Sequence, residues 1–164
     1  MTSTALGAGT ALGEALKTAG QSVAVAESST GGLIAASLLA VPGASAYFKG
    51  GTVIYTAQAR IELLKGDREE VRALGKDRAR LAGYFARRAR ELLDATWGIS
   101  ELGIAGPTGS PYGDPAGRSW IAVDGPVSRT RQIETGDADR EANMWRFTES
   151  ALEVLAECLR EASA

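Results

Sequence analysis

The hydroxyl-rich stretch AESSTGG, residues 26–32, carries the side chains in this chain that are best placed to do chemistry. Ser28, Ser29 and Thr30 follow the apolar run VAV and precede an apolar segment, so they fall where a strand turns into a helix. One interpretation is that a hydroxyl caps the helix by accepting a hydrogen bond from a first-turn N–H. The other is that a serine acts as a nucleophile or a phosphate contact, because helix N-termini beyond the carboxyl ends of strands favour anions.

A second candidate is the glycine-rich loop GIAGPTGSPYGDPAG, residues 103–117, which also follows an apolar strand-like run. Such a loop can close over a ligand or supply N–H donors to an oxyanion. It is not a phosphate-binding P-loop, because no Gly-Lys-Ser/Thr follows, and it lacks the spacing of a dinucleotide fingerprint. Taken alone, this loop is better explained as an irregular connection than as a site.

The absence of histidine restricts the chemistry further. It excludes Ser-His-Asp and Cys-His catalysis and removes the usual zinc and copper ligands. The single cysteine, Cys158, excludes an intrachain disulfide and a cysteine-cluster zinc site, and we expect it in the core. Acid–base catalysis must therefore use Lys, Tyr, Asp, Glu or water, and we expect neither a metal nor a cofactor.

Charge and hydropathy limit the partners. The net charge of −2 gives no polycationic surface for nucleic acid. No apolar run is long enough to cross a bilayer. The first residues lack the pattern of a signal peptide, so we expect a cytoplasmic location and no membrane partner. The length fits a single domain over residues 1–164.

The elements that must position these residues alternate along the chain. After a loose segment over residues 1–9, a helix is expected from Thr10 to Gly20. Strands are expected at 22–28, 50–56 and 99–106, helices at 31–41, 57–66, 76–96 and 139–161, and an antiparallel pair over 118–136. This order predicts an α/β domain with a mixed sheet and helices on both faces.

Four segments together resemble the CinA C-terminal domain family: AESSTGG, PGASAYFKGGTVIYT, GIAGPTG…PAGRSWIAV and ETGDADRE, in this order. The resemblance extends from about Leu12 to Leu159. It implies a three-layer α/β/α sandwich, often assembled as a homo-oligomer. The characterised members of the family are nicotinamide-nucleotide amidases, so the expected substrate is a small nucleotide amide, nicotinamide mononucleotide, hydrolysed to nicotinic acid mononucleotide and ammonia.

The resemblance also implies roles for individual residues. It makes Ser28 the nucleophile, places Tyr55 at a family-like position, and makes the base a lysine, whose position is taken here by Arg60. The expected ligand-binding residues are Glu27, Ser29, Thr30, Gly31, Gly32, Gly103, Ala105, Gly106, Thr108, Gly109 and Arg140.

Arg60 is not a conservative replacement. A guanidinium keeps its proton, with a pKa of about 12 or more, so it cannot act as a general base. Lys65 lies on another face of the expected helix, and Lys49 precedes the strand. The phenol of Tyr55 is a poor candidate for the general base at neutral pH. Glu27 can serve as the base only if it is desolvated. Its geometry toward Ser28 is unfavourable, because neighbouring strand residues point to opposite faces.

Further departures concern charge and hydroxyl groups. Asp114 stands where the family commonly has a lysine before proline, and Leu102 replaces a Thr or Ser. Ala138 and Ala142 occupy two arginine positions, and Arg140 is out of register by two, which predicts that it points elsewhere. These changes predict a pocket with less positive charge for an anionic mononucleotide.

Two functions therefore remain open. One is an amidase with Ser28 as nucleophile. The alternative is a catalytically degenerate member of the family that acts as a nucleotide-binding or regulatory module, for which the change to Arg60 is the main reason.

Overall fold

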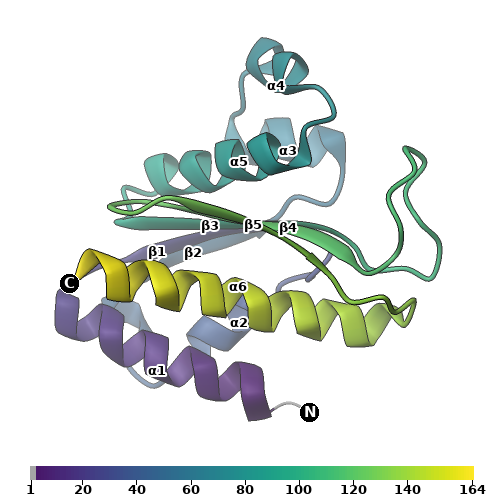
Figure 1. Ribbon diagram of the computed structural model, residues 1–164. Coiled ribbons are helices and arrows are strands. Elements are labelled where there is room, and N and C mark those ends of the chain that lie inside the picture. The colour runs from purple at the N-terminus through teal and green to yellow at the C-terminus, as the bar shows by residue number, and fades with distance from the viewer. Residues whose placement is uncertain (1–2) are drawn as a thin grey trace.

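The computed structural model describes residues 3–164 and forms three layers, with one sheet between two layers of helices (Figure 1). The sheet has five strands in the order β2-β1-β3-β4-β5. The strands are β1 (Val23–Glu27), β2 (Phe48–Val53), β3 (Trp97–Ile104), β4 (Arg118–Asp124) and β5 (Arg129–Glu134).

The helices divide between the two faces (Figure 1). One layer holds α3 (Ala57–Leu64), α4 (Arg68–Leu74) and α5 (Arg78–Leu92). The other holds α1 (Ser3–Ala19), α2 (Leu33–Leu39) and α6 (Arg140–Ala162), and a short 3₁₀ turn covers Ala44–Ala46. The predicted α/β/α sandwich is therefore confirmed. Within residues 3–164, no helix has the length and apolar character that crossing a membrane requires.

The sheet is mixed, as predicted. Strand β1 pairs in parallel with both β2 and β3, whereas β3, β4 and β5 pair antiparallel. Because the carboxyl ends of parallel strands meet at one edge, the segments that follow β1, β2 and β3 gather there. This topology brings the AESSTGG turn and the glycine-rich loop to the same edge.

Each face of the sheet buries its own core. Along β1, Val23 and Val25 face the cluster packed with α1, α2 and α6. Ala24 and Ala26 face the cluster packed with α3 and α5. All five residues of β1 are buried, which is expected of a central strand covered on both faces.

Three expectations about helices were wrong. Helix α1 begins at Ser3, so residues 3–9 are helical, and only the first two residues of the expected loose segment lie outside the described chain. Its small residues permit close packing, since a Cβ at Gly9 would overlap the Ser37 carbonyl of α2. Helix α4 was not expected. Helix α5 is shorter than the expected 76–96, because the Asp77 carboxylate accepts from Arg80 N and fixes its start.

Candidate functional site

A cavity of about 340 Å³ opens at the carboxyl edge of the sheet, where the two sequence motifs meet. Its lining comes from the ends of β1, β2 and β3, from α3, α5 and β4, from the glycine-rich loop and from the start of α6. The lining residues are Ser28, Ser29, Tyr55, Arg60, Arg78, Leu102, Gly103, Ile104, Ala105, Gly106, Thr108, Gly109, Ser110, Trp120 and Arg140. We call this cavity the serine pocket.

The AESSTGG turn does not cap helix α2 with a hydroxyl, so that interpretation was wrong. The N-cap residue is Gly32, and it makes no side-chain cap bond. The buried Glu27 carboxylate does this instead, accepting from Gly32 N at 2.8 Å, Ile34 N at 3.1 Å and Ala35 N at 3.0 Å. A carboxylate is well suited to this place, because the helix N-terminus is the positive end of its dipole. Glu27 is therefore committed to α2 and does not line the serine pocket.

A second buried carboxylate, Glu101 of β3, lies directly beneath the serines. Its Oε1 accepts from Ser29 Oγ at 2.6 Å and from Ser119 Oγ at 3.0 Å. Its Oε2 accepts from Ser28 N and Thr30 N, both at 3.1 Å. Burial raises the pKa of this carboxyl above the ordinary value, and these hydrogen bonds offset the rise only in part. No described Lys or Arg forms an ion pair with it.

The two serines differ in their partners. The Ser29 hydroxyl lines the pocket and is held by Glu101, whereas the Ser28 hydroxyl has no hydrogen-bond partner in the described part of the chain. Of the amides from Ser28 to Leu33, that of Ser29 is the one for which residues 3–164 offer no acceptor. An unpaired N–H beside a hydroxyl that contacts a carboxylate is the arrangement that a nucleophile with an oxyanion donor requires.

Gly103 makes this contact possible. A Cβ at Gly103 would overlap Glu101 Oε1 and Ser29 Oγ, and it would come within 2.8 Å of the Phe147 ring. The glycine-rich loop therefore begins with a residue that must be small so that the carboxylate and the serine can meet. This requirement involves a strand and a turn that lie far apart in the sequence.

Arg60 of α3 lines the pocket, and the position expected for a base thus faces the serines' cavity. Its Nε donates to the Ile54 carbonyl at 3.3 Å, and its guanidinium lies over the Phe85 ring at 5.9 Å. Burial and then the neighbouring Arg78 lower the pKa of Arg60, while Glu101 acts in the opposite direction. A guanidinium remains a cation under these influences, so Arg60 supplies charge rather than a base.

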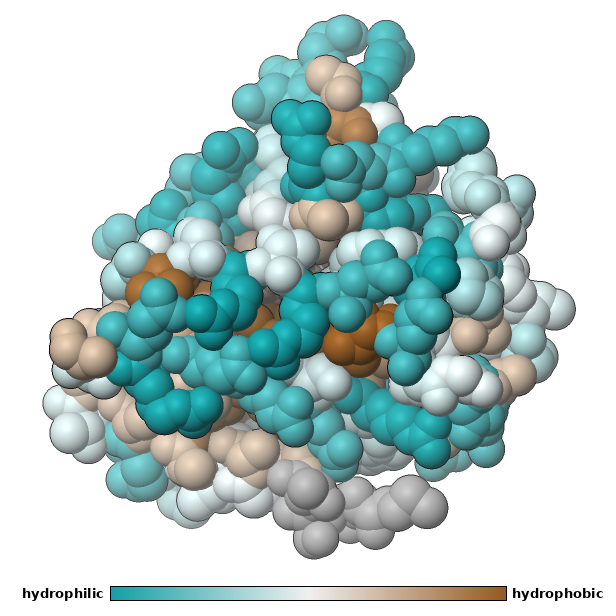
Figure 2. Space-filling view, in the orientation of Figure 1, coloured by the Kyte–Doolittle hydropathy of each residue, from teal (hydrophilic) through white to brown (hydrophobic). Residues whose placement is uncertain are grey.

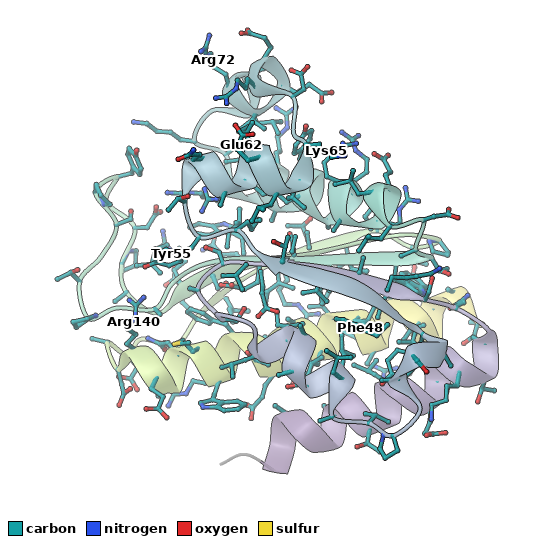
Figure 3. The ribbon with its side chains drawn as sticks, turned by 180° about the vertical axis from the view of Figure 1, so that it is seen from behind. Phe48, Tyr55, Glu62, Lys65, Arg72 and Arg140 are labelled. Atoms are coloured by element: carbon teal, nitrogen blue, oxygen red, sulfur yellow. The ribbon has the colours of Figure 1, made fainter. Side chains whose placement is uncertain are left out.

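Arg140 also enters the pocket, so the prediction that it points elsewhere was wrong (Figure 3). It is the first residue of α6, and it donates to the Gly106 carbonyl at 2.6 Å and to the Tyr55 hydroxyl at 3.1 Å. These contacts tie the start of α6 to the glycine-rich loop and to the segment after β2. Tyr55 remains largely exposed at the mouth of the pocket.

Arg78 was not expected at the site. It begins α5, lines the pocket, and lies 3.9 Å from the Asp114 carboxylate. Asp114 also organises the loop, since its Oδ2 accepts from Ser110 Oγ at 2.9 Å. With Arg60 and Arg140, the lining holds three guanidinium groups and no described carboxylate. The pocket is therefore positively charged despite the departures at Asp114, Ala138 and Ala142, because α3, α5 and α6 each place a guanidinium in its lining.

Several proposed site residues lie apart from this lining. Besides Glu27, they are Thr30, Gly31 and Gly32, which belong to the turn behind Ser28 and Ser29. Lys65 caps the far end of α3 (Figure 3), and Lys49 lies within β2, so neither lysine reaches the serines. Among the described residues, no group of three potential metal ligands forms a metal site.

Comparison with known proteins agrees with the geometry. The family described as the CinA C-terminal domain matches residues 8–159. A CinA-like protein of a Cyanothece species is 40% identical over 71% of this chain and 28% of its own length. The chain spans about a third of the length of the curated relatives it matches.

Solved structures show the same fold over nearly the whole chain. A CinA superfamily protein from Escherichia coli is 27% identical with a TM-score of 0.85, covering 93% of this chain and 88% of that one. The competence/damage inducible protein CihA from Agrobacterium tumefaciens is 28% identical with a TM-score of 0.84, covering 94% and 95%.

Proposed function

The chain belongs to the CinA C-terminal domain family, and from this premise we propose that it hydrolyses the carboxamide of an anionic nucleotide, with nicotinamide mononucleotide as the first candidate. The observation that carries the proposal is a pocket serine whose hydroxyl donates to a buried carboxylate, Ser29 Oγ to Glu101 Oε1 at 2.6 Å, in a cavity that guanidinium groups line. The products are the corresponding acid and ammonia.

The charge of the pocket supports an anionic substrate. Arg60, Arg78 and Arg140 contribute three fixed cations to the lining; Arg78 pairs with Asp114 at 3.9 Å, whereas Arg60 and Arg140 form no ion pair with a described carboxylate. Guanidinium groups bind phosphate through paired N–H donors. A nucleotide phosphate placed among them would leave the carboxamide free to reach the serines at the end of β1.

The identity of the nucleophile follows from which serine has a base. The family resemblance assigns this role to Ser28, but neither Arg60 nor any lysine can take its proton. Ser29 has the acceptor that a nucleophile needs, and the raised pKa of Glu101 makes it a stronger base than an exposed carboxylate. We therefore favour Ser29 with Glu101 as the reacting pair, and Ser28 as the alternative.

The steps balance without a cofactor. Ser29 Oγ attacks the amide carbon as its proton passes to Glu101, and the unpaired Ser29 N–H is available to the oxyanion. The protonated Glu101 then returns the proton to the departing nitrogen, which leaves as ammonia and gives an ester on Ser29. Water hydrolyses this ester, with Glu101 again accepting and returning a proton.

The test compares Ser28→Ala, Ser29→Ala and Glu101→Gln, with ammonia release from nicotinamide mononucleotide as the measurement. Ser128→Ala is the matched control, because Ser128 lies in the turn between β4 and β5, outside the pocket. We expect Ser29→Ala to lower kcat by about a thousandfold or more, as loss of a nucleophile does. Loss of activity in Ser28→Ala alone would assign the reaction to Ser28 and refute the pair.

A binding or regulatory module is the second candidate, and Arg60 is the observation that favours it. Calorimetry with nicotinamide and nicotinic acid mononucleotides separates the two functions. Binding of both nucleotides with no ammonia release from the wild-type chain would support the module and exclude the amidase. An Arg60→Lys variant that gains turnover would then show that only the base had been lost.

Assembly into a homo-oligomer belongs to the same proposal. The edge strand β2 has no neighbour on its outer side within residues 3–164, and Val53, Leu63, Leu92 and Leu93 are exposed around it. Unpaired edges and exposed apolar side chains favour association. Light scattering on the purified chain should give twice the chain mass or more, and Leu63→Glu with Leu93→Glu should lower it.

A further inference from the structure

A second cavity, of about 690 Å³, lies between α3, α4 and α5 and is lined by an unusual concentration of cations. Arg60, Arg68, Arg72, Lys76 and Arg78 all contribute to its lining, and no Asp or Glu of the described residues does. Figure 2 shows hydrophilic side chains gathered over these helices. We call this cavity the cationic annex.

The annex adjoins the serine pocket, and the two cavities share two side chains. Arg60 and Arg78 line both cavities and form the wall between them. Their charges act on each other, since the pKa of Arg60 is lowered by burial and next by Arg78. Asp114 offsets the charge of Arg78 from 3.9 Å and the buried Glu101 acts on Arg60, but the net effect of its surroundings still lowers the pKa of Arg60, so an anion bound at this wall would relieve the remaining repulsion.

The remaining cations of the annex are weakly neutralised. Arg68 pairs with Glu62 and Arg72 with Glu69, both as exposed ion pairs of the kind that contributes little. Lys76 has no ion-pair partner in the described part of the chain. Its ammonium group instead lies 5.3 Å from the centre of the Tyr112 ring. The annex thus holds cations that an incoming anion can engage without breaking a strong internal pair.

Aromatic rings border the same space. Tyr112 projects from the glycine-rich loop and is 66% exposed, and the guanidinium of Arg78 also lies over it, at 5.6 Å. Phe85 of α5 lines the inner wall beneath Arg60. Two rings beside several cations suit a ligand that combines phosphate with a planar group.

We propose that the serine pocket and the cationic annex together bind a nucleotide that carries a pyrophosphate, with one phosphate at the Arg60–Arg78 wall and the next in the annex near Lys76. The proposal goes beyond the proposed function, whose first candidate substrate carries a single phosphate, and binding to the annex does not require turnover. A monophosphate engages the cations of the serine pocket and leaves Arg68, Arg72 and Lys76 of the annex unused. The two cavities lie within the volume range that organic ligands occupy.

Isothermal calorimetry at fixed low salt tests the proposal with ADP against AMP, and with inorganic pyrophosphate against inorganic phosphate. The wild-type chain should bind the diphosphate of each pair at least tenfold more tightly. The double variant Lys76→Gln, Arg72→Gln should bring this ratio close to one while the Kd for phosphate and AMP stays within twofold. Arg87→Gln is the control, because Arg87 is an exposed cation of α5 outside both cavities.

Equal affinity for monophosphate and diphosphate in the wild-type chain would overturn the proposal. A preference that survives in the double variant, or that Arg87→Gln also removes, would overturn it as well, because general surface charge would then be responsible. Ammonia release is measured separately. Turnover without a diphosphate preference keeps the amidase and rejects the annex, and a diphosphate preference without turnover does the reverse.

Discussion

Replacing Glu101 is the sharpest test of the buried site, since it separates what the carboxylate does for the fold from what it does for chemistry. In Glu101→Ala the Ser29 and Ser119 hydroxyls and the Thr30 N–H lose their acceptor. In Glu101→Gln the amide oxygen can remain at the Oε2 position, facing Ser28 N and Thr30 N. The amide nitrogen then donates to the two hydroxyls, which can accept as readily as they donate.

The magnitudes of the two changes should differ. A buried donor left without an acceptor costs roughly 1–3 kcal/mol, so three of them make Glu101→Ala destabilising by about 3 kcal/mol or more. In a domain of this size, that loss lowers Tm by roughly 6–12 °C. Glu101→Gln should cost about 1 kcal/mol or less at neutral pH, because it keeps the hydrogen bonds and removes a carboxylate without an ion-pair partner.

The pH dependence gives a second, independent signature. Burial raises the pKa of Glu101 in the folded chain above its unfolded value of 4.5. The folded chain therefore binds the proton more tightly, and this contribution to stability is complete below the unfolded pKa and is lost as the pH rises through the folded pKa. Glu101→Gln cannot titrate, so it should gain stability relative to the wild type as the pH rises from about 4 to 8.

Urea unfolding at several pH values, followed by circular dichroism, measures this difference directly. The free energy of unfolding of Glu101→Gln minus that of the wild type should increase with pH across the window. A difference that is constant, or that falls with pH, would show that the folded pKa is not raised. The same result would remove the argument that Glu101 is a strengthened base for Ser29.

Three further changes test the surroundings. Gly103→Ala should destabilise the fold by about 2 kcal/mol or more and lower activity, since its Cβ would overlap Glu101 and Ser29; thermal unfolding and ammonia release measure both. Asp139→Ala should cost about 1 kcal/mol in urea unfolding, because the carboxylate caps α6 by accepting from Ala142 N. Arg140→Gln should raise the calorimetric Kd for a nucleotide monophosphate about tenfold and lower Tm by roughly 2–8 °C, because the hydrogen bonds to the Gly106 carbonyl and the Tyr55 hydroxyl are lost as well; an unaltered Kd would place the phosphate elsewhere.

The order of strands and helices could be predicted because local patterns determine it. The strand β1, the antiparallel pair of β4 and β5 and the end of α1 next to Gly20 were predicted correctly. The start of α1 could not, because its small residues indicate flexibility locally but serve close packing against α2, which is distant in the sequence. Helix α4 was missed because it has no buried residue and therefore no apolar period to detect.

The residues of the candidate site also divide into those that local sequence patterns indicate and those that only the fold brings together. The serines and Arg60 were found because motifs mark them, and Arg140 was retained although its register suggested another direction. Glu101 was read as part of an apolar strand, and nothing near it in the sequence indicates that its carboxylate accepts from five donors in two other segments, the turn after β1 and strand β4. Nothing near Arg78 in the sequence marks it as a site residue, and only the packing of α5 against the sheet brings it to the pocket.

These two misses have a common physical reason that bears on function. Comparing a sequence with a motif, position by position, detects a charged residue only at the positions where the motif has one. A ligand responds to every charge near it in space, whichever segment supplies that charge. The departures at Asp114, Ala138 and Ala142 suggested a pocket that had lost its affinity for anions. The fold brings guanidinium groups from the starts of α5 and α6 to the pocket, and it places a carboxylate beneath the serine turn. The charge of a site therefore cannot be deduced from motif positions alone, and the base at such a site should be sought among buried carboxylates that touch a pocket hydroxyl.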